Sequence, residues 1–356
     1  MSTLPPTMQA AILTGRNHLQ IQEVSTPKPG PMEVLLKVES CACCSTDVAL
    51  MNKPLPGQPP YGDFIPGHEY AGIVSALGEG VDEFKVGDRV AVEAHLGCMR
   101  CKNCRRGNYT ACLNYGTEKH RANGMTSNGG FAQFVINNIN TVHPIPNHID
   151  FNEAALITNL GCVLYGFETI GGYVAGNQVV VIGPGPLGLI SSQVAKELGA
   201  EKVYLIGTRA SRLNKGAETG ADRLINIHEE NAVDVILEET NGIGADLVVE
   251  SSGAIEAPMM AIKMAKPMGK ILILGIPQEP VLVDFEDLLL KNKSIHTVRG
   301  EGWSNVSRAV SLLGSGKVTL KPYVTHTFPL AEITTAFETF VKRIDGAVKV
   351  VVKSNE

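Results

Sequence analysis

VVVIGPGPLG, residues 179–188, is the stretch that decides the fold. Its apolar run predicts a buried strand, and LISSQVAKELG, which follows it, predicts a helix. Gly183, Gly185 and Gly188 form a G-x-G-x-x-G pattern at the turn between them. There the first glycine permits a tight bend, the second lets the backbone approach a pyrophosphate, and the third lets helix and strand pack closely. The stretch predicts a dinucleotide-binding loop, with Pro186 and Leu187 at the helix N-terminus that faces the phosphates.

Similar apolar stretches recur after this loop, with helical stretches between them. They are KVYLIG (202–207), DRLIN (222–226), DLVVES (246–251) and KILILG (270–275). Strands that are nearly all apolar and alternate with helices predict a parallel sheet covered on both faces. The fold class is therefore α/β, with a doubly wound, Rossmann-type cofactor domain over residues 156–296. We expect Gly275, at the end of the last of these strands, to line the cofactor site.

The end of the second strand bears on the choice of cofactor. Sites for NAD place an Asp or Glu about 20 residues beyond the glycine loop, where it binds the ribose 2′-hydroxyl. Here the strand ends in Gly207 and is followed by Thr208 and Arg209, so no carboxylate stands there. A hydroxyl and a guanidinium can bind a 2′-phosphate, so the sequence favours NADP(H) over NAD(H). Arg212, one helical turn on, either assists or is merely solvated.

The chain before residue 150 has a different character, with short strands broken by Gly and Pro. The strands are QAAILT, LQIQEV, EVLLKVES, AGIVSALG, DRVAVEA and GFAQFVI. Alternation and turn residues of this kind predict an all-β unit. After residue 295 the pattern is mixed, with helices over 303–314 and 331–343 and a last strand VKVVVK. Because 356 residues suit two domains, we place a β-rich catalytic domain at 1–155 and 297–356 around the cofactor domain.

Four cysteines form a cluster with the spacing C-x2-C-x2-C-x7-C. They are Cys98, Cys101, Cys104 and Cys112. The surrounding GCMRCKNCRRGNYTAC is too polar to bury thiols in an apolar core, whereas four thiolates at this spacing can bind one zinc ion tetrahedrally. A site filled by four sulfurs has no room for water or substrate. The cluster therefore predicts a structural zinc that braces a loop.

A second group of metal-binding residue types lies earlier, in CACCSTD and in the GHE of residues 67–69. A thiolate, an imidazole and a carboxylate from separate loops can hold zinc and leave one position open, which is the catalytic arrangement. Cys44, His68 and Glu69 are the predicted ligands of this catalytic zinc. Taken alone, a GHE is more often a turn with a hydrogen-bonded His, and CACC could be a strand of small packing residues.

Several motifs together resemble those of the zinc-dependent medium-chain dehydrogenase/reductase superfamily over essentially the whole chain. CACCSTD, PGHEYAG, VGDRV, the cysteine cluster, GPGPLG and GADLVVESSG stand in that family's order and spacing, and the tail KPYVTHTFPLAEITTAFETF is similar to sorbitol, other polyol and threonine dehydrogenases. The resemblance implies a GroES-like catalytic domain, a Rossmann domain, a cleft between them, and a homodimer or homotetramer. It also implies that Cys44, His68 and Glu69 are catalytic and that Thr46 passes the substrate proton toward solvent.

The chain departs from the family pattern at three places. Where the family commonly has a Cys, Asp or Glu near the zinc, this chain has Thr158 and Asn159, so water, Asn159 or Cys162 would complete the metal shell. Ala49 occupies the position of a histidine that ends the proton relay in some relatives. The tyrosine that sorbitol dehydrogenases carry after their catalytic cysteine has no match in DVALMNK, which weakens sorbitol itself as the substrate.

We therefore expect an enzyme that reversibly oxidises a secondary alcohol of a polyol or sugar derivative to a ketone. A threonine or amino-alcohol dehydrogenase is one alternative, and a non-catalytic regulatory protein that binds NADPH and zinc is another. Polar residues that could meet a small alcohol substrate, or be solvated loop residues, are Glu118, His120, Arg121 and Arg299.

Composition narrows the partners and the location. A net charge of −5 without a Lys/Arg-rich run argues against nucleic-acid binding. The N-terminus has no secretory signal pattern, and no window reaches the roughly 18 apolar residues of a membrane span. Eight cysteines, clustered rather than spread, suit a reducing compartment, so we expect a cytoplasmic protein that contacts no membrane.

Overall fold

The computed structural model describes residues 4–302 and 304–356, which divide into two compact units. The first unit contains the described chain up to Gly161 together with Gly300–Glu356, and the second is Cys162–Arg299. The sequence boundaries at 155/156 and 296/297 thus differ by a few residues from this division. The difference at the first boundary arises because helix α3 (Ile157–Thr169) runs from one unit into the other.

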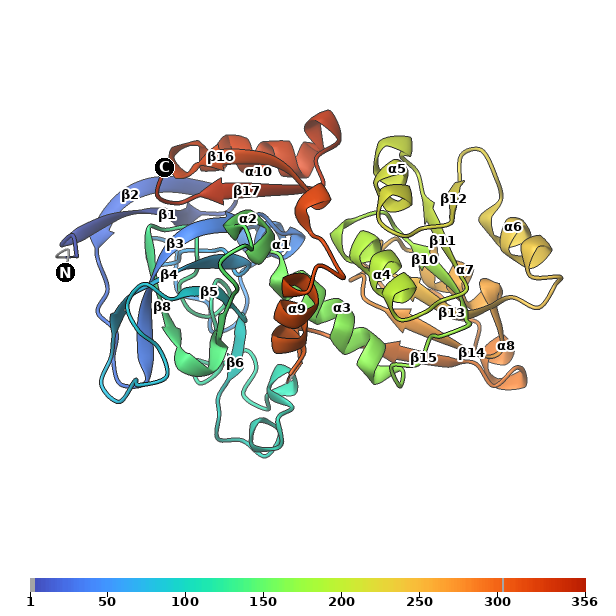
Figure 1. Cartoon of the computed structure of the whole chain (residues 1–356), viewed down its shortest axis with the longest axis horizontal. Coiled ribbons are helices and arrows are strands. Elements are labelled where there is room, and N and C mark those ends of the chain that lie inside the picture. Colours follow the sequence, from blue (N-terminus) through green and yellow to red (C-terminus); the bar gives the residue numbers. More distant parts are fainter. Residues whose placement is uncertain (1–3, 303) are drawn as a thin grey trace. The chain divides into compact units, whose positions relative to one another are not determined.

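The first unit is built around a seven-stranded sheet that joins both ends of the chain. Its order is β16-β17-β3-β4-β5-β9, with β8 paired to β3. Figure 1 shows the red C-terminal strand β17 beside the blue strand β3, with which it pairs in antiparallel fashion. The strands are β3 (Glu33–Ala42), β4 (Tyr70–Leu77), β5 (Arg89–Val92), β8 (Phe134–Asn138), β9 (Val142–Pro144), β16 (Val324–Pro329) and β17 (Lys349–Lys353).

Smaller elements complete this unit. A hairpin, β1 (Thr7–Gly15) with β2 (His18–Ser25), and a short pair, β6 (His95–Gly97) with β7 (Arg121–Ala122), lie outside the main sheet. The core is apolar and includes Leu35, Phe131 and Val350. Helices α9 (Asn305–Gly314) and α10 (Ile333–Lys342) agree with the helical stretches predicted over 303–314 and 331–343, and the short helix α2 (Phe151–Ala154) precedes α3.

One helix of this unit was not predicted. Helix α1 (Ser45–Asn52) lies in a region that the sequence assigned to strands and turns. Eight residues are too few for a helical period to stand out from the neighbouring alternation. The all-β prediction for this region is therefore wrong at α1, and this helix carries one of the predicted metal ligands at its start.

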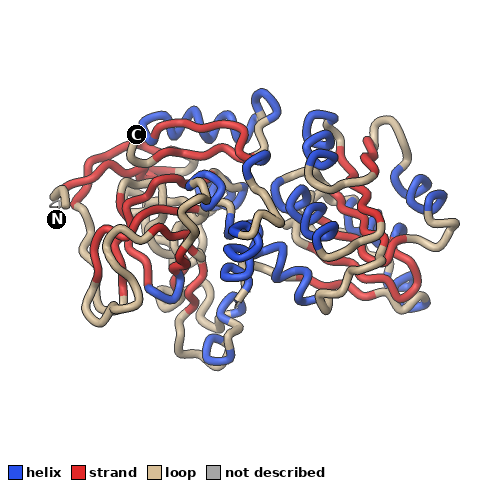
Figure 2. Tube along the Cα trace, viewed as in Figure 1, coloured by secondary structure: helices blue, strands red, loops and turns tan. Residues whose placement is uncertain are grey.

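The second unit is a six-stranded, all-parallel sheet of order β12-β11-β10-β13-β14-β15. The strands are β10 (Gln178–Ile182), β11 (Lys202–Gly207), β12 (Arg223–Asn226), β13 (Ala245–Glu250), β14 (Ala265–Ile273) and β15 (Ser294–Thr297). Helices α4 (Pro186–Glu197), α5 (Ala210–Glu218), α6 (Ala232–Glu239), α7 (Ala257–Met264) and α8 (Phe285–Leu290) connect them. Figure 2 shows this alternation of strand and helix, which confirms the predicted α/β class.

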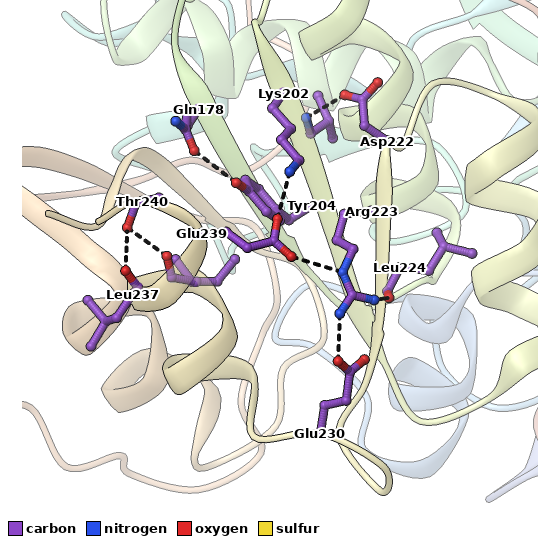
Figure 3. A network of polar contacts seen from close by, with 12 residues as sticks. Gln178, Lys202, Tyr204, Asp222, Arg223, Leu224, Glu230, Leu237, Glu239 and Thr240 are labelled. Atoms are coloured by element: carbon purple, nitrogen blue, oxygen red, sulfur yellow. Dashed lines mark hydrogen bonds and ion pairs between the residues drawn. The ribbon is translucent and has the colours of Figure 1, made fainter. Parts of the chain in front are cut away.

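A polar network fastens α6 to two neighbouring strands of this sheet (Figure 3). Glu239 accepts hydrogen bonds from Lys202 Nζ at 2.6 Å and from Arg223 Nε at 3.1 Å, and Arg223 also pairs with Glu230 at 2.5 Å. These groups are partly exposed, so each pair contributes at most about 1 kcal/mol. The network lies on β11, β12 and α6, and we treat it as structural support for the sheet.

Among the described residues, no helix has the length and apolar character needed to cross a membrane.

Candidate functional site

Cys44 stands at the N-cap of α1, directly after strand β3. Its backbone N–H donates to Asp47 Oδ2 at 3.0 Å, which closes the first turn of the helix around the cysteine. Burial raises the pKa values of Cys41 and Cys43 well above their usual range, so these two remain neutral thiols. Of the three cysteines in CACCSTD, Cys44 is the one that the structure places with other metal-binding side chains.

His68 and Glu69 lie just before β4, after a glycine that the turn requires. Gly67 has φ +98°, and a Cβ there would lie 2.8 Å from Cys41 Sγ. Its N–H donates to Asp47 Oδ1 at 3.2 Å, and His68 Nδ1 donates to the same oxygen at 3.0 Å. With Nδ1 engaged, Nε2 is the ring nitrogen left for a metal, as in many carboxylate–histidine–metal sites.

The ligand atoms of Cys44, His68 and Glu69 all lie within 4.8 Å of one another, and this donor set suits zinc. The charge around them also favours a cation. Burial alone would lower the pKa of His68, but the nearby Asp47 and Cys44 raise it well above its usual value. The sequence reasoning missed Asp47, although an acid three residues after an N-cap is a recognisable capping signal.

Glu69 has two further partners besides a possible metal. Its Oε2 is ion-paired with Lys349 Nζ, and its Oε1 accepts a hydrogen bond from Asn159 Nδ2 at 2.8 Å. Lys349 lies on β17 and also donates to the Cys43 carbonyl at 3.2 Å. The Glu69 carboxylate keeps the pKa of Lys349 raised, although burial acts in the opposite direction. Lys349 was also missed, because 280 residues separate it from Glu69.

The start of α3 offers candidates for completing the metal shell. Asn159 Oδ1 and Thr158 Oγ1 are buried and have no hydrogen-bond partner in the described part of the structure. Because Asn159 already contacts Glu69, its amide oxygen is close to the donor set and fits the prediction of a neutral side chain there. Cys162 belongs to the second unit. Thr46 is half-buried in the first turn of α1, two residues after Cys44.

The other polar residues that the sequence singled out have varied surroundings. Arg121 pairs with Glu33 at 3.0 Å on the surface, and Glu118 and Arg299 are exposed. His120 is buried and packs edge-on against Tyr115 at a centroid distance of 5.0 Å. None of these contacts links the four residues to the catalytic donor set.

The four-cysteine cluster forms a compact set of donors in its own lobe. The four sulfur atoms of Cys98, Cys101, Cys104 and Cys112 lie within 4.8 Å of one another. Backbone N–H groups donate to the sulfurs of Cys98 and Cys101 at 3.3 and 3.4 Å, as expected where thiolates bind a metal. Although burial acts in the opposite direction, N–H donors lower the pKa of Cys98 to about 6. Four converging thiolates fit a structural zinc.

The glycine loop has the shape that a pyrophosphate-binding turn needs. Gly183 has φ +100°, and a Cβ on Gly188 would lie 1.9 Å from the Gly183 carbonyl oxygen. A Cβ on Gly185 would meet no atom within 4 Å, so open space adjoins this residue at the start of α4. Pro186 is the first residue of α4, and Leu187 follows it half-buried.

The remaining predicted cofactor residues lie at strand ends of the same sheet. Thr208 and Arg209 are exposed directly after β11. Gly275 lies beyond β14, where a Cβ would be 2.4 Å from the Gly253 nitrogen. In parallel sheets, ligands bind at the carboxyl ends of the strands, and all these residues lie at that edge.

Comparison with known proteins agrees with both units. The alcohol dehydrogenase GroES-like domain model matches residues 30–147, and the zinc-binding dehydrogenase model matches residues 186–315. L-threonine 3-dehydrogenase of Pyrococcus furiosus is 35% identical over 87% of this chain and 88% of its own. Sorbitol dehydrogenase of Halalkalibacterium halodurans is 33% identical over 93% and 95%.

The chain belongs to the zinc-dependent medium-chain dehydrogenase/reductase superfamily. Its relatives place it in the threonine/sorbitol dehydrogenase branch and confirm the prediction of an oxidoreductase. Among solved structures, a zinc-binding dehydrogenase-type protein of Sinorhizobium meliloti bound to NADP has a TM-score of 0.90 at 28% identity, covering 98% of this chain and 100% of that one. An alcohol dehydrogenase of Thermus sp. has a TM-score of 0.86, also at 28% identity, with coverages of 97% and 99%.

The two cysteine-containing clusters differ in their donor atoms. The set around Cys44 combines a thiol with an imidazole and a carboxylate, whereas the lobe around Cys98 offers four sulfur donors. A mixed donor set is typical of catalytic zinc sites and a four-sulfur set of structural ones.

Proposed function

We propose that this dehydrogenase reversibly oxidises a secondary alcohol of a polyol or sugar derivative to a ketone, with NADP(H) favoured over NAD(H). The observation that supports it most is the convergence of Cys44, His68 and Glu69 ligand atoms within 4.8 Å. When bound, zinc would polarise the alcohol oxygen and NADP⁺ would accept the hydride. One zinc per chain would be catalytic and one structural.

The chain's own residues would bind the metal, orient its ligands, transfer the substrate proton and balance the buried charge. Cys44, His68 and Glu69 would hold the metal, and Asp47 orients the first two, through the Cys44 N–H and His68 Nδ1. Thr46 offers a hydroxyl at the start of α1 that can receive the substrate proton and pass it on to water. Lys349 balances the charge of Glu69, so the buried carboxylate does not stand unpaired.

Replacing Cys44 with Ser tests the metal mechanism. Turnover should collapse, because a serine hydroxyl is a poor zinc ligand, while NADPH binding to the glycine loop persists. Ser45→Ala, at an exposed neighbouring position, serves as the matched control. Undiminished turnover in the Cys44 variant would refute the mechanism and favour a different catalytic centre. A wild-type protein that binds NADPH and zinc but oxidises no alcohol would instead favour the regulatory role.

The cofactor preference rests on Thr208 and Arg209 at the end of β11, where no carboxylate stands. Arg209→Ala should weaken NADP(H) binding by about 1–3 kcal/mol, the range for losing a charge-assisted hydrogen bond, and affect NAD(H) little. Lys215→Ala removes a charge from the same helix, α5, and controls for net charge. Equal effects of Arg209→Ala on both cofactors, measured by fluorescence titration, would remove the basis for the NADP assignment.

A threonine-like amino alcohol is the second candidate substrate, since L-threonine 3-dehydrogenases are among the relatives. A screen that follows NADPH absorbance with polyols, sugar phosphates, amino alcohols and simple secondary alcohols separates the two. Turnover confined to amino alcohols would replace the polyol assignment.

The second unit also presents a surface that supports assembly into a homodimer or homotetramer. Strand β15 is an edge strand of its sheet. In the segment that precedes it in sequence, Leu282 and Phe285 are 82% and 74% exposed, and Leu289 and Leu290 are exposed on the same helix as Phe285, α8. Exposed apolar groups beside an unpaired strand edge favour association. Light scattering of wild type and Phe285→Glu tests this, and a monomeric wild type would contradict it.

A cytoplasmic location agrees with the eight free cysteines.

A further inference from the structure

A second buried pair of charged groups lies in the first unit, apart from the metal ligands. His95 Nδ1 and Glu301 Oε2 are 2.9 Å apart, and the two residues are 5% and 2% exposed. Burying a carboxylate costs several kcal/mol unless it is paired, and a fold gains little stability from such a pair over apolar residues. Neither residue figured in the sequence analysis. Their burial calls for a reason beyond stability.

The backbone around Glu301 is shaped to bring it to His95. Gly300 and Gly302 both have positive φ, at +74° and +59°. A Cβ on Gly300 would lie 3.1 Å from His95 Nδ1, so only glycine allows this close approach. The Gly302 carbonyl accepts hydrogen bonds from both the backbone and the side-chain nitrogens of Asn305, each at 3.0 Å, which fixes the loop to the start of α9.

This loop lies beside the candidate catalytic centre. A Cβ on Gly161, in the first turns of α3, would be 3.4 Å from Glu301 Cβ. Two residues earlier on the same helix, Asn159 donates to Glu69. Thr158, one turn before Gly161 and on the same face, has a buried hydroxyl without a partner in the described structure. The Glu301 side chain therefore packs at the turn of α3 that supplies Asn159 to Glu69 and carries the Thr158 hydroxyl.

The two carboxyl groups near His95, those of Glu93 and Glu301, have pKa values shifted in opposite directions. The nearby Glu93 accepts a hydrogen bond from the Tyr109 hydroxyl, and burial together with Glu301 raises the pKa of Glu93 to about 8. Burial would raise the pKa of Glu301 as well, but His95 lowers it, with a smaller contribution from His68. These shifts favour the protonated form of Glu93 and the ionised form of Glu301, and an ionised carboxylate can only accept hydrogen bonds.

We propose that Glu301, oriented by His95, determines specificity by accepting a hydrogen bond from a donor group on the carbon next to the reacting carbinol. The pair with His95 uses Oε2 and leaves Oε1 outside that bond. A vicinal hydroxyl or a vicinal ammonium supplies the required donor, whereas a vicinal carboxylate or phosphate would be repelled. The inference rests on the proposed alcohol oxidation and adds the substrate feature that the site selects.

Three small alcohols that share one secondary carbinol test this selection. Isopropanol has no vicinal donor, propylene glycol has a vicinal hydroxyl, and isopropanolamine has a vicinal ammonium. We expect wild type to prefer at least one donor-bearing alcohol over isopropanol in kcat/KM. Glu301→Gln, which keeps the size of the side chain, should lower kcat/KM for that alcohol by about 10- to 100-fold and change isopropanol oxidation little.

Two further variants separate recognition from folding. Glu93→Gln removes the neighbouring carboxyl without touching the proposed contact and should leave the substrate ratio unchanged. His95→Ala should lower the ratio as Glu301→Gln does, because it frees the carboxylate to turn away. If Glu301→Gln fails to fold by thermal unfolding, Glu301→Asp, with a shorter reach, should reduce the same ratio.

The outcomes distinguish this inference from the proposed function. A wild type that oxidises alcohols but shows no preference for a vicinal donor would overturn the inference alone. An equal loss for all three alcohols in Glu301→Gln would also overturn it and would show a general structural role for Glu301. No oxidation of any alcohol by wild type, with either cofactor, would overturn the proposed function itself. Preference for isopropanolamine over propylene glycol would identify ammonium as the donor.

Discussion

Gly185→Ala should separate cofactor binding from folding. Gly185 has φ −85° and ψ 179°, an extended conformation that any residue adopts, and its Cβ would meet no atom within 4 Å. Stability should therefore stay the same or rise by about 0.4–1 kcal/mol, through the less flexible unfolded chain. If the pyrophosphate occupies this space when NADPH binds, the added methyl group should weaken the free energy of binding by about 1–3 kcal/mol through overpacking. The Kd for NADPH should then rise by about 5- to 150-fold.

Gly188→Ala is the matched comparison within the same loop. Its Cβ would lie 1.9 Å from the Gly183 carbonyl oxygen and 2.6 Å from Ser251 Oγ, and no rotamer change relieves a backbone clash. This variant should lose about 1–3 kcal/mol of stability as well as cofactor affinity. Urea unfolding and fluorescence titration with NADPH measure the two effects. Normal NADPH affinity in a folded Gly185→Ala protein would refute the reasoning, since the open space would then not be the pyrophosphate's.

Three further predictions concern the first unit. Asp47→Asn should weaken zinc binding about 10- to 100-fold in chelator competition, because the ring of His68 loses its orienting carboxylate; an unchanged affinity would contradict this role. Lys349→Met should cost about 3–5 kcal/mol in urea unfolding, because Glu69 is left buried and unpaired; a smaller cost would mean that solvent or a metal compensates the charge. Metal analysis should find about two zinc ions per wild-type chain and about one in Cys112→Ser, with stability lost before turnover; equal zinc contents would contradict a structural site there.

Much of the fold follows from local patterns in the sequence. The strands of the second unit are predicted by apolar runs. A strand in a parallel sheet is buried on both faces, so nearly all of its consecutive residues are apolar. The glycine loop is predicted because each of its three glycines meets a local steric requirement: a tight turn, close approach to a pyrophosphate, or close packing of helix and strand. Helix α1 was missed because a helix of eight residues carries too little periodicity. At the first boundary the predicted division differs from the compact units because α3 continues from one unit into the other.

The candidate site was predictable only in part. Cys44 and His68 could be recognised from residue type and motif, since thiolates and imidazoles are common zinc ligands. Asp47 carried a local capping signal that was overlooked. Lys349 and Glu301 had none, because their roles depend on contacts across 280 and 206 residues. Residue type alone does not tell a buried charged side chain from a solvated one.

Long-range pairing explains how these charges can be buried at all. The pairs are Asp47 with His68, Glu69 with Lys349, and Glu301 with His95. A single unpaired member of any pair would cost several kcal/mol, so each pair must close as its partners are buried. The partners come from α1, from the loop before β4, from β6, from the loop before α9 and from β17. The proposed catalytic metal site and the proposed specificity residue therefore assemble only when the C-terminal segment has returned to the N-terminal strands. A chain that ends before β17 would leave Glu69 unpaired in the core.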